Sequence, residues 1–171
     1  YDYIKDFEER FKFKARNPIS TGWPKIDKIT KGGLGIGELS VVVAPTGAGK
    51  SHVLVHLGAQ ALKQGKNVVH YTLELADTAV AKRYDACLTG HNLDDLLEQK
   101  DDILEKIKEV DGQLIIKEYP TKSASVTTIR NHLEKVKQTQ MEVDMVIVDY
   151  GDLLRSVHRN TEKRHDLESI Y

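Results

Sequence analysis

The sequence has little cysteine and no long apolar run, and both absences narrow its function. Cys87 is the single cysteine in 171 residues, which excludes an internal disulfide and is typical of a reducing cytosol. No stretch of 18 apolar residues occurs, so no membrane span is predicted. The first residues lack the basic-then-apolar order of a signal peptide. We therefore expect a cytoplasmic protein with no membrane partner.

An excess of positive charge is also absent. The net charge is −1, which gives no overall basic surface for nucleic acid, so a DNA contact would need a local patch or residues outside this sequence. Hydrophobic residues make up 40% and charged residues 30%, as is usual for a globular domain. The sequence does not begin with Met, so we expect a piece of a longer chain. Its 171 residues suffice for one domain with a sizeable core.

The most informative stretch is V-V-V-A-P-T-G-A-G-K-S at residues 41–51. A run of β-branched residues predicts a buried strand, a loop with two glycines follows, and the next residues open an apolar helix. The glycines let successive N–H groups point at one anion, and the helix N-terminus adds its positive dipole end. We predict a nucleotide-binding loop formed by Ala44, Pro45, Thr46, Gly47, Ala48, Gly49, Lys50, Ser51 and His52.

Within this loop, Lys50 can reach the outer phosphates and the Ser51 hydroxyl can ligate Mg²⁺. The loop departs from the full G-x-x-x-x-G-K-[ST] pattern at one position, where Ala44 replaces the first glycine. Because Ala44 ends the expected strand, a small side chain can suffice there. His52 and His56 stand four residues apart on the following helix, but no third ligand has suitable spacing, so we expect no metal site between them.

Apolar strands alternate with helices along the chain. Strands are expected at 39–44, 68–73, 114–117 and 145–148, and helices at 53–62, 77–88 and 126–136, with shorter helices from residue 24 and within 91–110. Strands nearly continuous in Val and Ile predict an α/β fold, in which a parallel sheet is covered by helices on both faces. Such sheets bind ligands at the carboxyl edge of their strands, where Lys50, Glu74 and Asp149 would meet.

Two acidic residues complete the expected site. Asp149 follows an apolar strand and can hold Mg²⁺ through water together with Ser51. Glu74 ends the neighbouring strand and can polarise an attacking water, although a solvated carboxylate at the entry to a helix explains the same position. With Lys50, these residues predict a hydrolytic site in which Glu74 and Lys50 are the catalytic residues.

With these motifs, the sequence resembles the ATPase domain of DnaB-like replicative DNA helicases, within the RecA-like P-loop NTPases and particularly their phage versions. The match covers S-T-G-W-P (20–24), G-G-L-G-I-G-E-L (32–39), Y-T-L-E-L (71–75) and V-I-V-D-Y (146–150). The resemblance implies a three-layer RecA-like ATPase domain over residues 18–171, preceded by a linker helix and linker over residues 1–17. It also implies ATP and Mg²⁺ as cofactors, with Glu74 as the catalytic base and Ser51 and Asp149 as the Mg²⁺ residues.

The same resemblance implies partners and further parts. The N-terminal helix, with Ile4, Phe7 and Phe11 on one stripe, would dock on an adjacent subunit of a hexameric ring rather than fold back on its own domain. In this family a further strand follows Asp149 and lies between the loop strand and the Asp149 strand, and DNA-binding loops and an arginine finger come later. We therefore expect a fold that is incomplete on its C-terminal side, and a fragment that alone hydrolyses ATP poorly.

For the whole protein, the resemblance implies ATP-driven DNA unwinding in the cytoplasm of a bacterial or phage-infected bacterial cell. Single-stranded DNA would be bound through residues beyond this sequence, and primase and a loader would be partners. One departure from the family stands near the end, where Y-G-D-L at residues 150–153 lacks the glutamine of the usual D-Y-L-Q-L segment.

Three other functions stay open. A RecA- or KaiC-like ATPase, used in recombination or regulatory assembly, would have the same phosphate-binding and metal-binding residues. The segment from Thr21 to Glu38, which precedes the loop, favours the helicase. A small-molecule or nucleotide kinase would need an acceptor pocket and a mobile basic lid, and no arginine-rich, glycine-hinged insert is found. An ATP-gated structural or loader protein would bind the nucleotide without needing Glu74 for hydrolysis.

Overall fold

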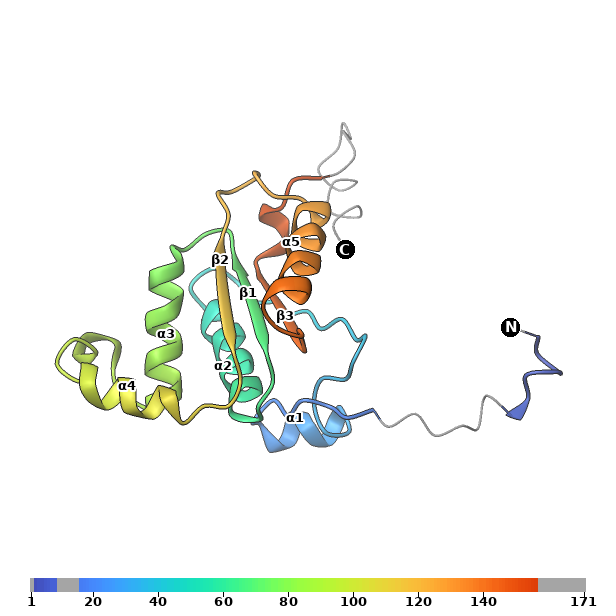
Figure 1. Ribbon diagram of the computed structural model, residues 1–171, viewed down its shortest axis with the longest axis horizontal. Helices are drawn as coiled ribbons and strands as arrows, with labels where there is room; N and C mark the ends of the chain where they lie inside the picture. Colours follow the sequence, from blue (N-terminus) through green and yellow to red (C-terminus); the bar gives the residue numbers. More distant parts are fainter. Residues whose placement is uncertain (1, 9–15, 157–171) are drawn as a thin grey trace.

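Three parallel strands form the centre of the computed structural model, which describes residues 2–8 and 16–156 (Figure 1). The strands lie in the order β2-β1-β3, with bounds β1 (Val68–Thr72), β2 (Leu114–Glu118) and β3 (Met145–Asp149). Val68 pairs with both Leu114 and Met145, so the three strands begin and end at matching levels. Because β1 has a strand on each side and helices on each face, all five of its residues are buried.

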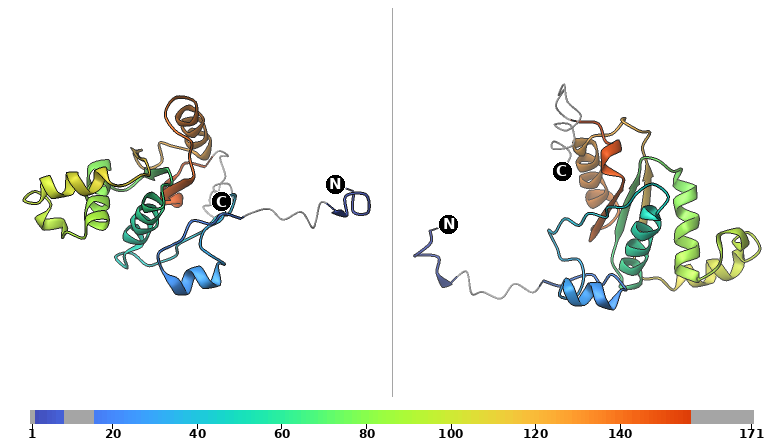
Figure 2. Two further views of the ribbon diagram at one scale, coloured as in Figure 1. Left: turned by 60° about the horizontal axis from the view of Figure 1, so that its bottom comes forward. Right: turned by 180° about the vertical axis from the view of Figure 1, so that it is seen from behind.

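Helices cover both faces of the sheet (Figure 2). On one face, α2 (Lys50–Lys63) and α3 (Asp77–Thr89) pack together, and their apolar residues join those of β1 and β3 in one buried cluster. On the other face, the apolar stripe of α5 (Val126–Thr139) meets Tyr71 in a second cluster. The predicted α/β fold, a parallel sheet in a three-layer arrangement, is therefore confirmed.

Shorter elements connect these layers. The one-turn 3₁₀ helix η2 (Leu93–Asp95) and α4 (Lys100–Lys108) lie between α3 and β2, as predicted for residues 91–110, and η3 (Gly151–Leu153) follows β3. Residue type favours Asp77 as the cap of α3, but the cap is Ala76 and Asp77 is the first helical residue. Over residues 2–8 and 16–156, no helix is long and apolar enough to cross a membrane.

The strand expected at 39–44 does not form, which corrects the sequence-based prediction. Residues 39–45 carry no regular secondary structure, and Val41 and Val43 are 59% and 89% exposed. A groove of about 640 Å³ separates residues 36–42 from β3. Within the described ranges, the edge of β3 that faces away from β1 has no strand beside it. A single extended segment without a hydrogen-bonding neighbour is not a stable strand, whatever its β propensity.

The expected N-terminal helix is only partly described. Residues 2–8 form turns away from the sheet (Figure 1), and 9–15 lie outside the described residues. Ile4 and Phe7 are 81% and 51% exposed, so this part of the stripe is not buried against its own domain. In α1 (Pro24–Ile29), Pro24 starts the helix as predicted, and the isoleucine at the end of this helix is 81% exposed.

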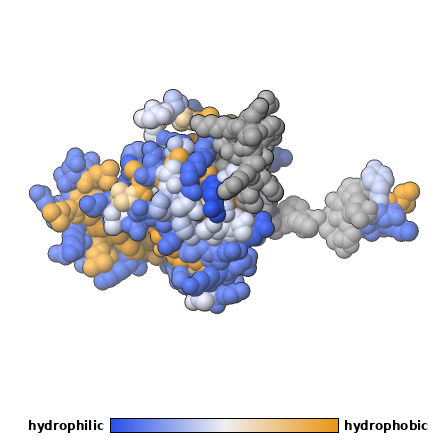
Figure 3. Space-filling view, turned by 90° about the horizontal axis from the view of Figure 1, so that it is seen from above, coloured by the Kyte–Doolittle hydropathy of each residue, from blue (hydrophilic) through white to orange (hydrophobic). Residues whose placement is uncertain are grey.

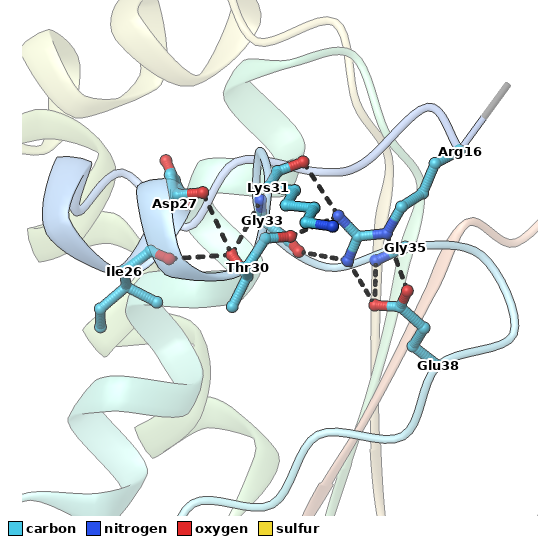
Figure 4. Close-up of polar contacts among 8 residues, drawn as sticks. All are labelled: Arg16, Ile26, Asp27, Thr30, Lys31, Gly33, Gly35 and Glu38. Atoms are coloured by element: carbon cyan, nitrogen blue, oxygen red, sulfur yellow. Dashed lines mark hydrogen bonds and ion pairs between the residues drawn. The ribbon is translucent and has the colours of Figure 1, made fainter.

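The side chain of Arg16, which precedes α1, forms hydrogen bonds with the turn that leads to the loop at residues 44–51 (Figure 4). Its guanidinium donates to both carboxylate oxygens of Glu38, at 2.8 and 2.6 Å. It also donates to the backbone carbonyls of Thr30, Lys31 and Gly33. The hydrogen bond from Arg16 is the main cause that lowers the pKa of Glu38 to about 2. One side chain thus fastens the end of α1 to the entry of the loop.

Apolar side chains gather on the surface formed by α4 and the chain before it, at the left of Figure 3. Leu93, Leu97 and Leu104 are 44%, 85% and 52% exposed. Single exposed leucines are ordinary on a protein surface, whereas neighbouring ones mark a candidate contact surface.

Candidate functional site

The loop at residues 44–51 enters α2 through two glycines with positive φ. Gly47 has a φ of 79°, and Gly49, the N-cap of α2, has a φ of 90° and a ψ of 20°. Only glycine adopts this backbone without strain. No side chain caps α2, and its first turn carries no acidic residue. The N–H groups of that turn can therefore be satisfied by a bound anion, which the positive end of the helix favours.

Lys50 is the first residue of α2, and its side chain lies against the end of β3. Its Nζ is 3.6 Å from the centroid of the Tyr150 ring, which is a cation–π contact. Tyr150 directly follows Asp149, so the contact places the loop lysine at the carboxyl end of β3.

Asp149 ends β3 with a buried carboxylate. It is 1% exposed and pairs across the sheet with Thr72, the last residue of β1. Its Oδ1 has no hydrogen-bond partner among the described residues. A buried carboxylate oxygen without a donor is unfavourable unless a cation or a water meets it, and carboxylate oxygens are ligands that Mg²⁺ prefers. Asp149 therefore fits the ligand shell of a divalent cation.

His70 lies on the same face of the sheet as Asp149, two residues before Thr72, and is fully buried. Its Nδ1 is 2.9 Å from the Tyr84 hydroxyl oxygen, while its Nε2 has no partner within the described part of the chain. Burial lowers the pKa of His70 to about 4, and the Asp149 charge only partly opposes this shift. His70 is therefore an uncharged neighbour of Asp149 near neutral pH.

Glu74 lies two residues beyond the end of β1, and its side chain is exposed. The N–H of Leu73 donates to the backbone carbonyl of Asp149 at 2.9 Å. The turn that carries Glu74 is thus attached directly to the end of β3. Glu74 and Asp149 belong to the same carboxyl edge of the sheet, as expected from the order of strands and helices.

The remaining loop residues lie at the start of α2. Ser51 is half-buried in the first turn and His52 is exposed. His56 contacts other partners: its Nε2 is 2.9 Å from the carbonyl oxygen of Thr21, and its ring stacks on Trp23 with centroids 4.1 Å apart. The described residues contain no group of three His, Cys, Asp or Glu side chains that could hold a metal. Mg²⁺ shared between one carboxylate, a hydroxyl, waters and phosphates does not need such a group.

A glycine loop of this kind, set at the carboxyl edge of a parallel sheet with helices on both faces, defines the class of P-loop nucleotide-binding domains. Within that class, the family model described as DnaB-like helicase C terminal domain matches residues 18–170. The chain therefore belongs to the DnaB-like helicase C-terminal domain family.

Relatives of known description agree with this family. The DnaB-like replicative helicase of Enterobacteria phage T4 is 36% identical over an alignment of 169 residues, and the match covers 91% of this chain and 35% of that protein. The replicative DNA helicase DnaB of Mycoplasma genitalium is 28% identical over an alignment of 175 residues, and the match covers 94% of this chain and 37% of that protein. The chain thus spans well under half the length of these relatives.

Two solved structures share the fold. The first, described as the structure of a DnaB-like replicative helicase and its interactions with primase, has a TM-score of 0.76 at 15% identity and covers 98% of this chain and 43% of that chain. The second is described as an ATPase domain, has a TM-score of 0.70 at 16% identity and covers 98% and 62%. These matches establish the RecA-like fold.

Three further residues at this edge carry no sequence-based prediction. Thr72 closes a turn around Glu74, and a hydroxyl residue just before a turn is a signal for such a bond. Thr121 and Tyr150 contact the site from the loop after β2 and the end of β3. Neither of these two contacts has a local sequence signal, because both depend on tertiary packing.

Proposed function

We propose that this domain binds ATP with Mg²⁺ and hydrolyses it to drive DNA unwinding, as part of a ring-forming replicative helicase. One observation carries the proposal: the loop lysine and the turn of Glu74 both contact the end of β3, beside the buried Asp149, in a chain of the DnaB-like helicase family. Phosphoryl transfer depends mainly on positioning and charge stabilisation, and such an arrangement is suited to both.

We assign nucleotide binding and hydrolysis to different residues of the site. The loop N–H groups and Lys50 hold the phosphates, and Ser51 and Asp149 share Mg²⁺ through water. Mg²⁺ held by these residues would neutralise charge on the phosphates. Glu74, on the exposed side of the edge, orients and polarises the attacking water. Loss of Lys50 should therefore remove binding, whereas loss of Glu74 should remove turnover.

Assembly into a hexameric ring is part of the proposal. The N-terminal segment docks on an adjacent subunit, and the exposure of Ile4 and Phe7 supports this because their burial against a neighbour is favourable. Single-stranded DNA is bound by the whole protein. A primase contact is supported by the description of one structural relative, a DnaB-like helicase studied with primase.

The resemblance to the family implies a further strand after Asp149, and such a strand would fill the groove between residues 36–42 and β3. Apolar residues line both walls of this groove, among them Leu39, Val42, Val146 and Val148. The outer edge of β3 offers backbone groups that such a strand would pair. Its insertion would give residues 39–44 the hydrogen-bonding neighbour that a strand requires.

The test is ATP hydrolysis by the full-length protein with and without single-stranded DNA, in the wild type, Lys50→Ala and Glu74→Gln. DNA should stimulate the wild type, and Lys50→Ala should lose nucleotide binding. Glu74→Gln should still bind ATP but lose about 100-fold or more in kcat. Glu142→Gln, an exposed carboxylate just before β3, is the matched control. Wild-type turnover in Glu74→Gln, or phosphate transfer to a nucleoside monophosphate, would contradict the proposal.

A further inference from the structure

The hydroxyl of Thr72 closes the turn that carries Glu74. Thr72 is fully buried at the end of β1. Its Oγ1 donates to the carbonyl oxygen of Leu75 at 2.8 Å and accepts from the N–H of Leu75 at 3.2 Å. One hydroxyl thus satisfies both backbone groups of the residue that follows Glu74. The backbone just after Glu74 is therefore held against the buried end of β1.

A second hydroxyl holds the residue on the other side of Glu74. Thr121, in the loop after β2, donates from Oγ1 to the carbonyl oxygen of Leu73 at 2.9 Å. The N–H of Leu73 is already bonded to the carbonyl of Asp149. Both backbone groups of Leu73 are therefore occupied, one by β3 and one by the β2 loop.

The β2 loop is itself anchored to the chain after β3. The N–H of Lys122 donates to the carbonyl oxygen of Leu153 at 2.8 Å. The Lys122 ammonium donates to the carbonyl oxygens of Asp152 and Leu154, at 2.9 and 3.1 Å. Hydrogen bonds thus connect the segments that follow all three strands at the carboxyl edge. Thr121 links this connected backbone to the turn that carries Glu74.

We propose that Thr72 and Thr121 are positioning residues that hold the backbone on both sides of Glu74, so that its exposed carboxylate keeps one direction relative to Asp149 and Lys50. This inference rests on the proposed hydrolytic role of Glu74. A carboxylate on an exposed, untied turn would sample many directions. Misplacement of a catalytic group by about 1 Å can cost about 100-fold in rate, so two hydroxyls that only touch backbone can control turnover.

Valine and serine substitutions separate positioning from packing. Thr72→Val keeps the shape of the side chain and removes the hydroxyl, whereas Thr72→Ser keeps the hydroxyl. Thr121→Val and Thr121→Ser repeat the comparison at an exposed position, where loss of one hydroxyl does not threaten folding. Thr139→Val, which removes a similar hydroxyl-to-carbonyl bond at the end of α5, is the matched control.

The variants are compared in the full-length protein by kcat and KM for ATP, affinity for a fluorescent ADP analogue, and thermal unfolding. Thr72→Val should lower kcat by about tenfold or more while KM and ADP affinity change by less than about twofold. Thr121→Val should lower kcat by a smaller factor than Thr72→Val. Both serine variants should keep most of the wild-type kcat, and Thr139→Val should match the wild type.

A double variant adds a readout that a purely structural role would not produce. If Thr72 acts through Glu74, then Glu74→Gln with Thr72→Val should be no slower than Glu74→Gln alone. If Glu74→Gln keeps the wild-type rate, the proposed function itself fails. If Glu74→Gln is inactive but both valine variants keep the wild-type kcat, only this inference is overturned. Should Thr72→Val not fold, Thr121→Val decides in the same way.

Discussion

The carboxylate of Glu38 accepts two hydrogen bonds from the guanidinium of Arg16, from Nε at 2.8 Å and from Nη2 at 2.6 Å. The same guanidinium donates to the carbonyl oxygens of Lys31 and Gly33, at 3.0 and 2.9 Å (Figure 4). The planar guanidinium, with five N–H donors in a fixed fork, can meet both oxygens of a carboxylate and several backbone carbonyls together. Arg16 therefore acts through its geometry more than through its charge.

Arg16→Lys should consequently lower the Tm almost as much as Arg16→Met, by a few degrees, because an ammonium cannot replace the fork. Thermal unfolding of both variants measures this, with Lys25→Met on α1 as a control at an exposed lysine. The Glu38 contribution should be complete above about pH 4.5 and be lost as the pH falls toward its pKa of about 2. A wild-type Tm for Arg16→Lys would show that charge alone is sufficient.

His70 should make the stability of the domain depend on pH on the acid side. Its pKa falls from 6.5 to about 4, mainly through burial, so the unfolded chain binds a proton that the folded protein resists. The free energy of unfolding should be unaffected above about pH 6.5 and decrease below it, by up to about 3 kcal/mol near pH 4. Urea unfolding across this range should show a smaller decrease in His70→Gln than in the wild type. The exposed-site variant His52→Gln should behave as the wild type, and equal decreases in all three would contradict the prediction.

Gly58 on α2 makes room for Tyr84 on α3. A Cβ at position 58 would overlap the Tyr84 hydroxyl oxygen and lie 2.9 Å from its Cζ. Tyr84 is 2% exposed, so it cannot move aside without losing its contact with His70. Gly58→Ala should destabilise the protein by about 1–3 kcal/mol, although alanine has the better helix propensity. Tyr84→Phe in the same background removes the overlapping oxygen and should recover part of this loss in urea unfolding. If Tyr84→Phe does not recover stability in the Gly58→Ala background, the overlap with the Tyr84 hydroxyl is not the cause of the destabilisation.

The sequence predicts those parts of the fold that depend on local pattern. The stripe from Val126 to Val136 lies within α5 as expected, because helical periodicity is a property of the segment itself. Val41 and Val43 have the same β-branched character as β1, yet they stay outside the sheet. Their pattern reports strand propensity but not whether a neighbouring strand is present to pair with them.

The site shows the same division. The order of strands and helices predicts that Lys50 and Asp149 lie at one edge, and the contact of Lys50 with Tyr150 agrees with this, although the strand expected before the loop does not form. Thr121 reaches Leu73 across 48 residues, and His70 stays neutral only because it is buried. Contacts of this kind depend on how the layers pack, so single-sequence patterns do not contain them.

Substitution of the buried Asp149 by asparagine should have opposite effects on the stability of the free protein and on its stabilisation by a bound nucleotide. Its Oδ1 is buried and meets no donor within the described residues, and an uncompensated buried charge is unfavourable. Asp149→Asn should therefore raise the Tm of the nucleotide-free protein, by the equivalent of about 1–3 kcal/mol. The same change removes an anionic ligand for Mg²⁺, so the rise in Tm on adding a non-hydrolysable ATP analogue with Mg²⁺ should shrink.

Thermal unfolding with and without the Mg²⁺–analogue complex measures both effects in one variant. Asp94→Asn, at an exposed carboxylate in η2, should change neither and serves as the control. A variant that is less stable in both conditions would mean that the Asp149 carboxylate stabilises the fold through its other oxygen. A variant with an unchanged response to the complex would mean that Mg²⁺ is held by other groups. Only the pair of opposite signs agrees with a carboxylate kept at this edge for a cation rather than for the fold.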